Sequence, residues 1–247
     1  EWDAVVAYAV EHGLGGVEAL SGIPGSAGAT PVQNVGAYGA EIADVLTRVR
    51  LHNRETGADE WVPASSLDLA YRYSNLKFTS RAVVLEIELQ LEKTDESIPL
   101  RHLGGARVPL AEARDSVLET RRAKGMVLDA ADHDTWSAGS FFTNPVVPSV
   151  LADEIAAQVG EEAMPRFAAG EGKEKLSAAW LIERAGCHRG FPGDDAPARL
   201  STKHTLALTN RGNACAADIV DLARRVQAQV RDAFGVELHP EPVWVGL

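Results

Sequence analysis

The sequence has few cysteines, no long apolar run and fewer basic than acidic residues, and each shortage excludes a class of protein. Its two cysteines, Cys187 and Cys215, stand far apart without metal-ligand spacing, which predicts free thiols and no metal site. No stretch approaches the roughly 18 apolar residues of a membrane helix, and the first residues lack the layout of a signal peptide. Lys and Arg total 24 against 35 Asp and Glu, a net charge of −11, which argues against nucleic-acid binding. We therefore expect a cytoplasmic protein that binds neither a membrane nor a nucleic acid.

The residues that are present have the composition of an ordinary globular protein, with 45% hydrophobic and 24% charged side chains. Their periodicity predicts helices at about residues 2–12, 110–123, 150–158, 176–185 and 215–234. It predicts strands at about residues 42–51, 82–91, 140–147, 204–209 and 243–246. The alternation within the second of these strands places on one face Val83, Leu85, Ile87, Leu89 and Leu91.

These elements do not follow a βαβ rhythm, so the sequence predicts the α+β class. We place a domain boundary near Met126, which gives one domain over residues 1–126 and a second over residues 127–247. The chain begins without Met and already within a helical pattern. We therefore expect that the natural protein starts further upstream.

A glycine-rich segment follows the first helix. Eight glycines lie between Gly13 and Gly39, and within this region residues 21–39 read SGIPGSAGATPVQNVGAYG. Glycine allows a ligand to approach the backbone, and free N–H groups can bind phosphates. The segment lacks the lysine of a P-loop and the GxGxxG spacing of a dinucleotide fold. By itself it is better explained by a pair of tight turns.

Two further segments could carry chemistry. Arg72, in the sequence YRYSNLKF, precedes the strand at 82–91 and could be directed into a cleft, although an isolated arginine is more often a solvated surface residue. Ser140, in GSFFTNP, presents a hydroxyl beside two aromatic residues. No GxSxG elbow is present, which argues against a serine hydrolase. The plain alternative for Ser140 is a serine that ends a loop before a buried strand.

Glu241 stands between Pro240 and Pro242 near the end of the chain. Two prolines restrict the local backbone strongly, which would help to orient a general acid or its supporting partner. A rigid surface turn is the plain alternative. The residue gains significance only together with the other segments.

Taken together, the four segments resemble the UDP-N-acetylenolpyruvoylglucosamine reductases (the MurB family), whose typical motifs are IPG with PxQNxGAYG, YRxSxxK, GSFFxNP and LxPE. The resemblance extends from residue 21 to residue 241. It implies a two-lobed FAD-binding domain like those of vanillyl-alcohol oxidase and the PCMH group, followed by an α+β substrate-binding domain. It also implies that the N-terminal part of the FAD-binding domain is missing here.

The resemblance further implies a flavoprotein oxidoreductase of peptidoglycan synthesis, which serves cell-wall biogenesis, cell shape and cell division. NADPH would reduce FAD, and the enolpyruvyl group of UDP-N-acetylenolpyruvoylglucosamine would then be reduced to give UDP-N-acetylmuramate. In the catalytic roles that it implies, Arg72 and Glu241 support the developing enolate and Ser140 supplies a proton. We expect a monomer.

The same resemblance assigns binding roles. Cofactor-binding positions would be Ile23, Pro24, Gly25, Gly28, Ala29, Thr30, Val32, Gly36 and Tyr38. Substrate-binding positions would be Gln33, Asn34, Tyr71, His102, Arg121, Lys124, Asn144 and His204. Arg121 and Lys124 suit the substrate's diphosphate, although a charge pair at a helix end explains them nearly as well. His102 stands where related chains close a tyrosine over the substrate.

Two alternatives from other classes stay open. One is a UDP-sugar-binding protein that has lost its flavin, which the missing N-terminal part suggests. The other is a different FAD-dependent oxidoreductase of the same fold. A colourless protein that still binds the sugar nucleotide would favour the first, and no oxidation of NADPH on addition of the enolpyruvyl sugar would favour the second.

Overall fold

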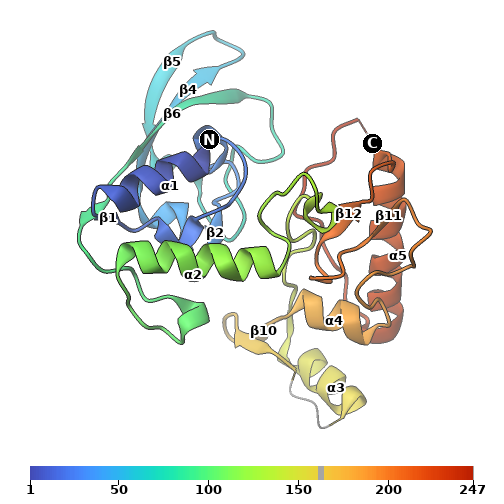
Figure 1. Ribbon diagram of the computed structural model, residues 1–247. Helices are drawn as coiled ribbons and strands as arrows, with labels where there is room; N and C mark the ends of the chain where they lie inside the picture. The colour runs from blue at the N-terminus through green and yellow to red at the C-terminus, as the bar shows by residue number, and fades with distance from the viewer. Residues whose placement is uncertain (161–163, 247) are drawn as a thin grey trace. The chain divides into compact units, whose positions relative to one another are not determined.

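The computed structural model describes residues 1–160 and 164–246, and it divides into two compact units, Glu1–Ala123 (unit 1) and Lys124–Leu247 (unit 2). Both units combine helices and strands, as Figure 1 shows. The α+β class is therefore confirmed. None of the helices in the described part of the chain has both the length and the hydropathy of a membrane span.

Unit 1 is built around two helices, α1 (Trp2–Glu11) and α2 (Leu110–Ala123). Both match the predicted ranges closely, because each carries an apolar stripe of helical spacing that it buries in the core of the unit. The side chain of Trp2 is fully buried and donates a hydrogen bond from Nε1 to the carbonyl of Leu20, 3.1 Å away. Arg114 on α2 forms two hydrogen bonds of 2.7 Å to the carboxylate of Asp3 on α1, which joins the helices.

A three-stranded antiparallel sheet completes this core, with β4 (Leu46–Asn53) between β5 (Asp59–Pro63) and β6 (Ala82–Leu89). The three strands lie side by side in Figure 1. Arg50 pairs with Glu86 and the next residue of β4 pairs with Val84, so Leu85 is an extra residue that forms a bulge.

Because of the bulge, the prediction that the alternating apolar residues of this strand all share one face is wrong. Val83 and Leu85 are 49% and 42% exposed, whereas Val84 is partly buried against the core. Ile87 and Leu89, beyond the bulge, do face the core as predicted. An inserted residue reverses the alternation of the side chains at that point, because successive residues of a strand point to opposite faces.

The strand predicted from residue 42 begins later, at Leu46. Residues Ile42–Asp44 instead form a 3-10 turn (η3), in which Glu41 and Asp44 satisfy each other's backbone N–H groups in a capping box. The backbone N–H of Glu41 donates to the carboxylate of Asp44 over 2.7 Å. This local side-chain bonding outweighs the strand preference of the run.

The remaining elements of unit 1 are short. They are the strands β1 (Leu14–Gly15), β2 (Gly36–Ala37), β3 (Ala40–Glu41) and β7 (Glu92–Lys93) and the 3-10 turns η1 (Glu18–Leu20), η2 (Ala27–Ala29), η4 (Ala64–Leu67) and η5 (Arg101–Leu103). Between them run the connections that carry the predicted flavin-binding motif. The glycine-rich segment thus contains turns and a small hairpin rather than a helix or a long strand.

Unit 2 packs three helices around a separate core: α3 (Ser149–Val159), α4 (Ala178–Arg184) and α5 (Ala216–Phe234). Val226, Val230 and Phe234 of α5 are buried at helical spacing, and Gly235 ends the helix with a φ of 66°. A three-stranded sheet joins β8 (Val146–Pro148), β10 (Lys173–Leu176) and β9 (Arg166–Ala168), while β11 (Ala198–Leu200) pairs with β12 (Leu208–Asn210).

Three strand predictions in unit 2 need correction. Of the strand expected at 140–147, only Val146 and Val147 lie in a strand (β8), β12 begins at Leu208 rather than near residue 204, and residues 243–246 form no strand. Phe141 and Phe142 nevertheless pair with other segments. Phe142 forms an isolated bridge with Pro240, and Phe141 forms backbone hydrogen bonds with Leu206 and Glu241. The backbone groups of Phe141 and Phe142 are therefore paired by single contacts rather than by a continuous strand ladder.

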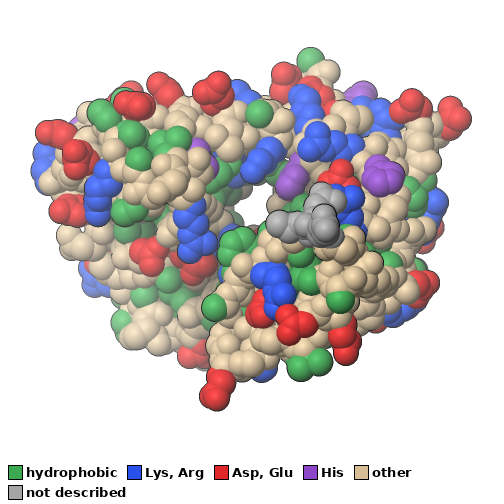
Figure 2. Space-filling view, turned by 90° about the horizontal axis from the view of Figure 1, so that it is seen from below, with side chains coloured by type: hydrophobic (Ala, Val, Ile, Leu, Met, Phe, Trp, Pro, Cys, Tyr) green, Lys and Arg blue, Asp and Glu red, His purple; other side chains and the backbone are tan. Residues whose placement is uncertain are grey.

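Side chains of both charges are interspersed with apolar atoms on the face drawn in Figure 2. Such a mixed surface is usual for a globular protein. Among the described residues on this face, Figure 2 shows no continuous basic patch, in keeping with the net charge of −11.

Candidate functional site

The predicted flavin-binding segment exposes its backbone around Gly25. Pro24, Gly25 and Ser26 are exposed, and Gly25 has a φ of 116° with open space where a side chain would project. Gly28 lies so close to β6 that an added Cβ would be 3.1 Å from the carbonyl of Val84. One glycine thus leaves an open backbone for a ligand, and the other allows the loop to pack on the sheet.

Thr30 and Asn34 of the same segment are occupied within unit 1. The hydroxyl of Thr30, which is 2% exposed, donates to the carbonyl of Ala27 over 2.7 Å. The buried amide of Asn34 donates to Glu41 and to the carbonyl of Ala70, over 2.8 and 3.0 Å. The structure therefore gives both side chains a part in shaping the loop, and their ligand-binding roles stay predictions.

Arg72 lies against the glycine-rich segment. Its guanidinium donates to the carbonyls of Asn34 and Gly36 and lies 3.7 Å from a carboxylate oxygen of Glu41. A Cβ on Gly36 would be 2.8 Å from Arg72 Nη1, so only glycine permits this approach. The ring of Tyr71 lies 5.0 Å from the guanidinium carbon, close enough for a cation–π contact.

Three of the predicted site residues that are not glycine adopt left-handed backbone conformations. The φ angles are 46° for Asn34, 51° for Tyr38 and 53° for Arg72. Such conformations cost on the order of 1 kcal/mol or more each and tend to gather at functional sites. Asn34 and Tyr38 belong to the glycine-rich segment, and Arg72 donates hydrogen bonds to it.

Tyr38, His102 and Arg121 are three further predicted site residues in unit 1. The ring centroids of Tyr38 and His102 are 4.7 Å apart, and His102 Nε2 lies 2.9 Å from the hydroxyl of Ser116 on α2. Arg121 donates to the carbonyl of Gly22 over 3.3 Å. Burial raises the pKa of Tyr38 and lowers the pKa of Arg121, and each group opposes the other's shift. His102 is thus held on α2 and beside the predicted flavin-binding Tyr38.

Ser140 and Glu241 belong to neighbouring segments of unit 2. The backbone N–H of Glu241 donates to the carbonyl of Phe141 over 2.8 Å, and the bridge between Phe142 and Pro240 continues the pairing. Gly139 has a φ of 80° with open space around it, which makes the turn that leads into Ser140. The backbone in this way brings together segments that are far apart in the sequence.

Asn144 and His204 lie on two other segments of unit 2. The side-chain oxygen of Asn144 accepts a hydrogen bond from the N–H of Ala178, 3.0 Å away at the start of α4. Burial, together with the nearby charges of Lys124 and Arg189, lowers the pKa of His204 to about 4. The imidazole is therefore neutral at physiological pH and can act as a hydrogen-bonding group without a charge. Sequence reasoning had not linked Lys124 with His204.

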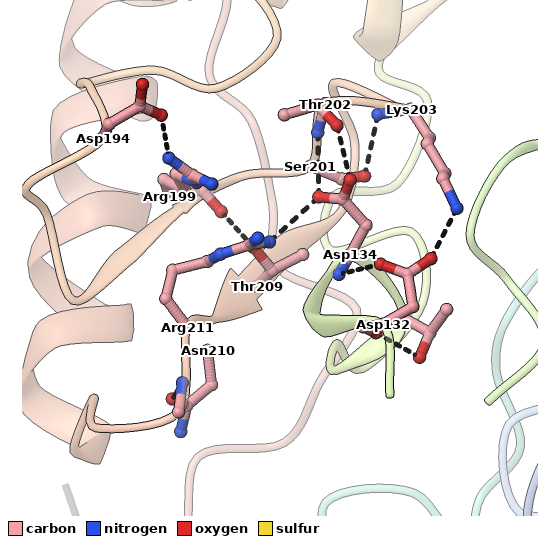
Figure 3. Close-up of polar contacts among 12 residues, drawn as sticks. Asp132, Asp134, Asp194, Arg199, Ser201, Thr202, Lys203, Thr209, Asn210 and Arg211 are labelled. Carbon is pink, nitrogen blue, oxygen red and sulfur yellow. Dashed lines mark hydrogen bonds and ion pairs between the residues drawn. The ribbon is translucent and has the colours of Figure 1, made fainter. Parts of the chain in front are cut away.

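Sequence reasoning missed a group of polar contacts centred on Asp134, which Figure 3 shows. The carboxylate of Asp134 accepts hydrogen bonds from Thr202 and Arg211, and the carboxylate of Asp132 accepts one from Lys203. The only signal in the sequence is a pair of aspartates shortly before the GSFFTNP motif. Their partners lie far along the chain, beyond the reach of any local pattern.

Comparison with known proteins agrees with these features. Residues 130–245 match the family described as UDP-N-acetylenolpyruvoylglucosamine reductase, C-terminal domain. The chain is 63% identical to UDP-N-acetylenolpyruvoylglucosamine reductase 2 of Corynebacterium glutamicum, covering 100% of this chain and 70% of that protein. It is 62% identical to the UDP-N-acetylenolpyruvoylglucosamine reductase of Corynebacterium diphtheriae, covering 100% of this chain and 67% of that protein.

A solved structure shares the fold. The crystal structure of UDP-N-acetylenolpyruvylglucosamine reductase (MurB) from Thermus caldophilus aligns with 96% of this chain and 67% of its own, with a TM-score of 0.64. The sequence identity is 24%, so this likeness is evidence for the fold alone.

Proposed function

Because this chain belongs to the UDP-N-acetylenolpyruvoylglucosamine reductase family and is an oxidoreductase, we propose that it catalyses the NADPH-dependent, FAD-mediated reduction of UDP-N-acetylenolpyruvoylglucosamine to UDP-N-acetylmuramate. The product is a precursor of peptidoglycan, which links the proposed reaction to cell-wall biogenesis, cell shape and cell division. The observation that carries the proposal is the hydrogen bond from the backbone N–H of Glu241 to the carbonyl of Phe141, which holds the main chain of Glu241 beside the segment that contains Ser140.

Ser140 is proposed as the proton donor. Its hydroxyl would give a proton to the substrate carbon that becomes a carbanion when the enolpyruvyl double bond is reduced. A serine hydroxyl is a weak acid, so the site must be dry and must hold the developing negative charge. The buried side chains of Phe141 and Phe142, which follow Ser140, support the first requirement.

Arg72 and Glu241 are proposed to support the enolate. A guanidinium is always charged and donates in a rigid fork, so a fixed arginine can stabilise the charge that develops beside the substrate carboxylate. The contacts of Arg72 with the carbonyls of Asn34 and Gly36 support this role, because they fix the fork in one orientation. The carboxyl of Glu241 would complete the protonation site.

The residues of the glycine-rich segment fit a flavin. At the exposed turn, a side chain added to Gly25 would meet no atom within 4 Å of its Cβ, so the backbone there is accessible to a flat ligand. FAD supplies, when bound, the hydride that originates from NADPH. The residues that would hold it are Ile23, Pro24, Gly25, Gly28, Ala29, Thr30, Val32, Gly36 and Tyr38.

The remaining predicted residues would bind the substrate. Arg121 and Lys124 have the charge to meet a diphosphate, and a neutral His204 can donate or accept a hydrogen bond at the sugar nucleotide. Asn144 is held by Ala178, which fixes the orientation of its amide. Gln33, Asn34, Tyr71 and His102 complete the set proposed from the family motifs.

The proposal is tested with the complete natural protein and its flavin. NADPH is added first and the enolpyruvyl sugar nucleotide second, while flavin absorbance and the mass of the sugar product are followed. We expect bleaching of the flavin by NADPH and its recovery on addition of the substrate, with formation of UDP-N-acetylmuramate. A colourless protein that binds the sugar nucleotide, or a reduced flavin that the substrate does not reoxidise, would overturn the proposal in favour of one of the two alternatives.

A further inference from the structure

Asp134 is a buried carboxylate close in sequence to Ser140. It lies in the 3-10 turn η6 (His133–Thr135), is 6% exposed, and its backbone N–H donates to the carboxylate of Asp132 over 2.9 Å. The turn is pinned further by Thr135, whose hydroxyl donates to the carbonyl of Asp129 over 2.8 Å. The position of the Asp134 carboxylate is therefore fixed by its own turn before any distant contact is considered.

Two residues far along the chain donate to this carboxylate. The backbone N–H of Thr202 and the guanidinium of Arg211 each lie 3.0 Å from Asp134 Oδ1, and the hydroxyl of Thr202 donates to Oδ2. Figure 3 shows these contacts converging on one side chain. Burial alone would raise the pKa of Asp134, but hydrogen bonds from Thr202 and the charge of Arg211 outweigh it and lower the pKa below its usual value. The group is therefore an ionised acceptor with donors on both oxygens.

The segment that Asp134 holds, residues 201–207, also contacts the proposed catalytic segment. The N–H of Ser201 donates to the carbonyl of Ala207 over 2.8 Å, which closes the segment on itself. The N–H of Phe141 donates to the carbonyl of Leu206, also over 2.8 Å. One end of the segment is thus fixed on Asp134, and the other end holds the residue next to Ser140.

Phe141 connects this segment with Glu241. Its N–H is bound by Leu206 and its carbonyl accepts the N–H of Glu241, so both of its main-chain groups are used. A displacement of residues 201–207 would therefore reach the backbone on which both Ser140 and Glu241 depend. All the residues that connect Asp134 with Ser140 and Glu241 in this way belong to unit 2.

We propose that Asp134 is a positioning residue, which fixes residues 201–207 through Thr202 and Arg211 and thereby fixes the backbone of Phe141 between Ser140 and Glu241. This inference rests on the proposed function, because it assigns a role to Asp134 in delivery of the proton. Asparagine would remove the negative charge that pairs with Arg211 and would turn an N–H₂ group toward the Thr202 hydroxyl, which would then have to accept rather than donate, so the hold on residues 201–207 would weaken.

The principal test compares Asp134→Asn with Asp194→Asn in the complete flavin-containing protein. Asp194 is a matched control because it is an exposed aspartate in the same unit, and its partner Arg199 lies on β11, outside residues 201–207. We expect Asp134→Asn to slow reoxidation of the flavin by the enolpyruvyl sugar by about ten- to a hundred-fold, the effect of a small misplacement of reacting groups. Reduction of the flavin by NADPH should be unchanged in both variants.

A second measurement does not depend on catalysis. Amide hydrogen exchange should show faster exchange at Phe141 and Ala207 in Asp134→Asn than in Asp194→Asn. Thr202→Val should slow reoxidation in part. Thr202→Ser, which keeps the hydroxyl, should leave the rate of reoxidation close to that of the wild-type protein. These variants keep the inference testable should Asp134→Asn not fold.

The outcomes separate this inference from the proposed function. Equal slowing of both half-reactions, unchanged reoxidation, or unchanged exchange at Phe141 would each overturn the role of Asp134. A wild-type protein that does not convert the enolpyruvyl sugar would overturn the proposed function instead. In that case the exchange rate at Phe141 still decides whether Asp134 fixes the segment.

Discussion

The guanidinium of Arg72 lies 3.7 Å from the carboxylate of Glu41, and the same carboxylate accepts a hydrogen bond of 2.8 Å from the buried amide of Asn34. Glu41 therefore connects the proposed catalytic arginine to the interior of unit 1. A carboxylate that balances an arginine also restricts the directions in which the guanidinium can point. The orientation of Arg72 depends in this way on a residue that has no assigned contact with a ligand.

Replacing Glu41 by Gln should weaken this hold on Arg72. We expect kcat for reduction of the enolpyruvyl substrate to fall by about ten-fold, because a misplaced guanidinium supports the enolate poorly. Steady-state kinetics would measure the change, with Glu60→Gln on the exposed strand β5 as the control. A loss of the same size in both variants would contradict the assigned role of Glu41.

Replacing Ser140 by Ala should separate the two half-reactions. Reduction of the flavin by NADPH should be unaffected, while reoxidation by the substrate should slow by about 10² to 10⁴, the usual range for a lost general acid. Rapid-mixing absorbance measurements would follow each half-reaction. Equal slowing of both would remove Ser140 from the proton-transfer step.

Replacing Arg114 by Ala should destabilise unit 1. The change removes two charge-assisted hydrogen bonds of 2.7 Å to Asp3, so we expect a loss of about 1–2 kcal/mol in the free energy of unfolding. Chemical denaturation would measure it, and Arg122→Ala, an exposed change on the same helix, should shift the value by less than about 0.5 kcal/mol. Similar values for the two variants would show that the ion pair adds little.

His204 should make the stability of unit 2 depend on pH. Its pKa is about 4 in the folded protein against a usual value of 6.5, so the unfolded chain binds more protons between these values. The free energy of unfolding should therefore fall as the pH drops from 6.5 to 4, by at most about 1.4 kcal/mol per pH unit. Denaturation at several pH values should give a shallower slope for His204→Gln than for the exposed-site control His188→Gln. Identical slopes would rule out His204 as the source.

Local patterns were sufficient for the helices and for the class of fold. The predicted helix at 110–123 matches α2 to the residue, because apolar spacing and charges at the helix end are both encoded within one short stretch. The faces of β6 were predicted incorrectly at Val83 and Leu85. The bulge that exposes them arises from pairing with β4, a strand that lies well before β6 in the sequence.

Residues of the candidate site could be predicted from the sequence only where they belong to a family motif. Arg72, Ser140 and Glu241 each have a plain structural alternative, and the roles proposed for them rest on their motifs occurring together. Asp134 has no such motif, and its donors Thr202 and Arg211 lie 68 and 77 positions away. Contacts of this kind depend on the packed structure, so the sequence alone could not indicate them.

The φ of 53° at Arg72 has a consequence for how position 72 should respond to selection or redesign. Glycine adopts this conformation without the penalty of roughly 1–2 kcal/mol that a side chain incurs. Glycine at position 72 would remove this penalty, but it would also remove the hydrogen bonds to the carbonyls of Asn34 and Gly36 and the contact with Glu41. Position 72 is thus a point at which the backbone conformation favours glycine while the side-chain contacts and the proposed activity favour arginine.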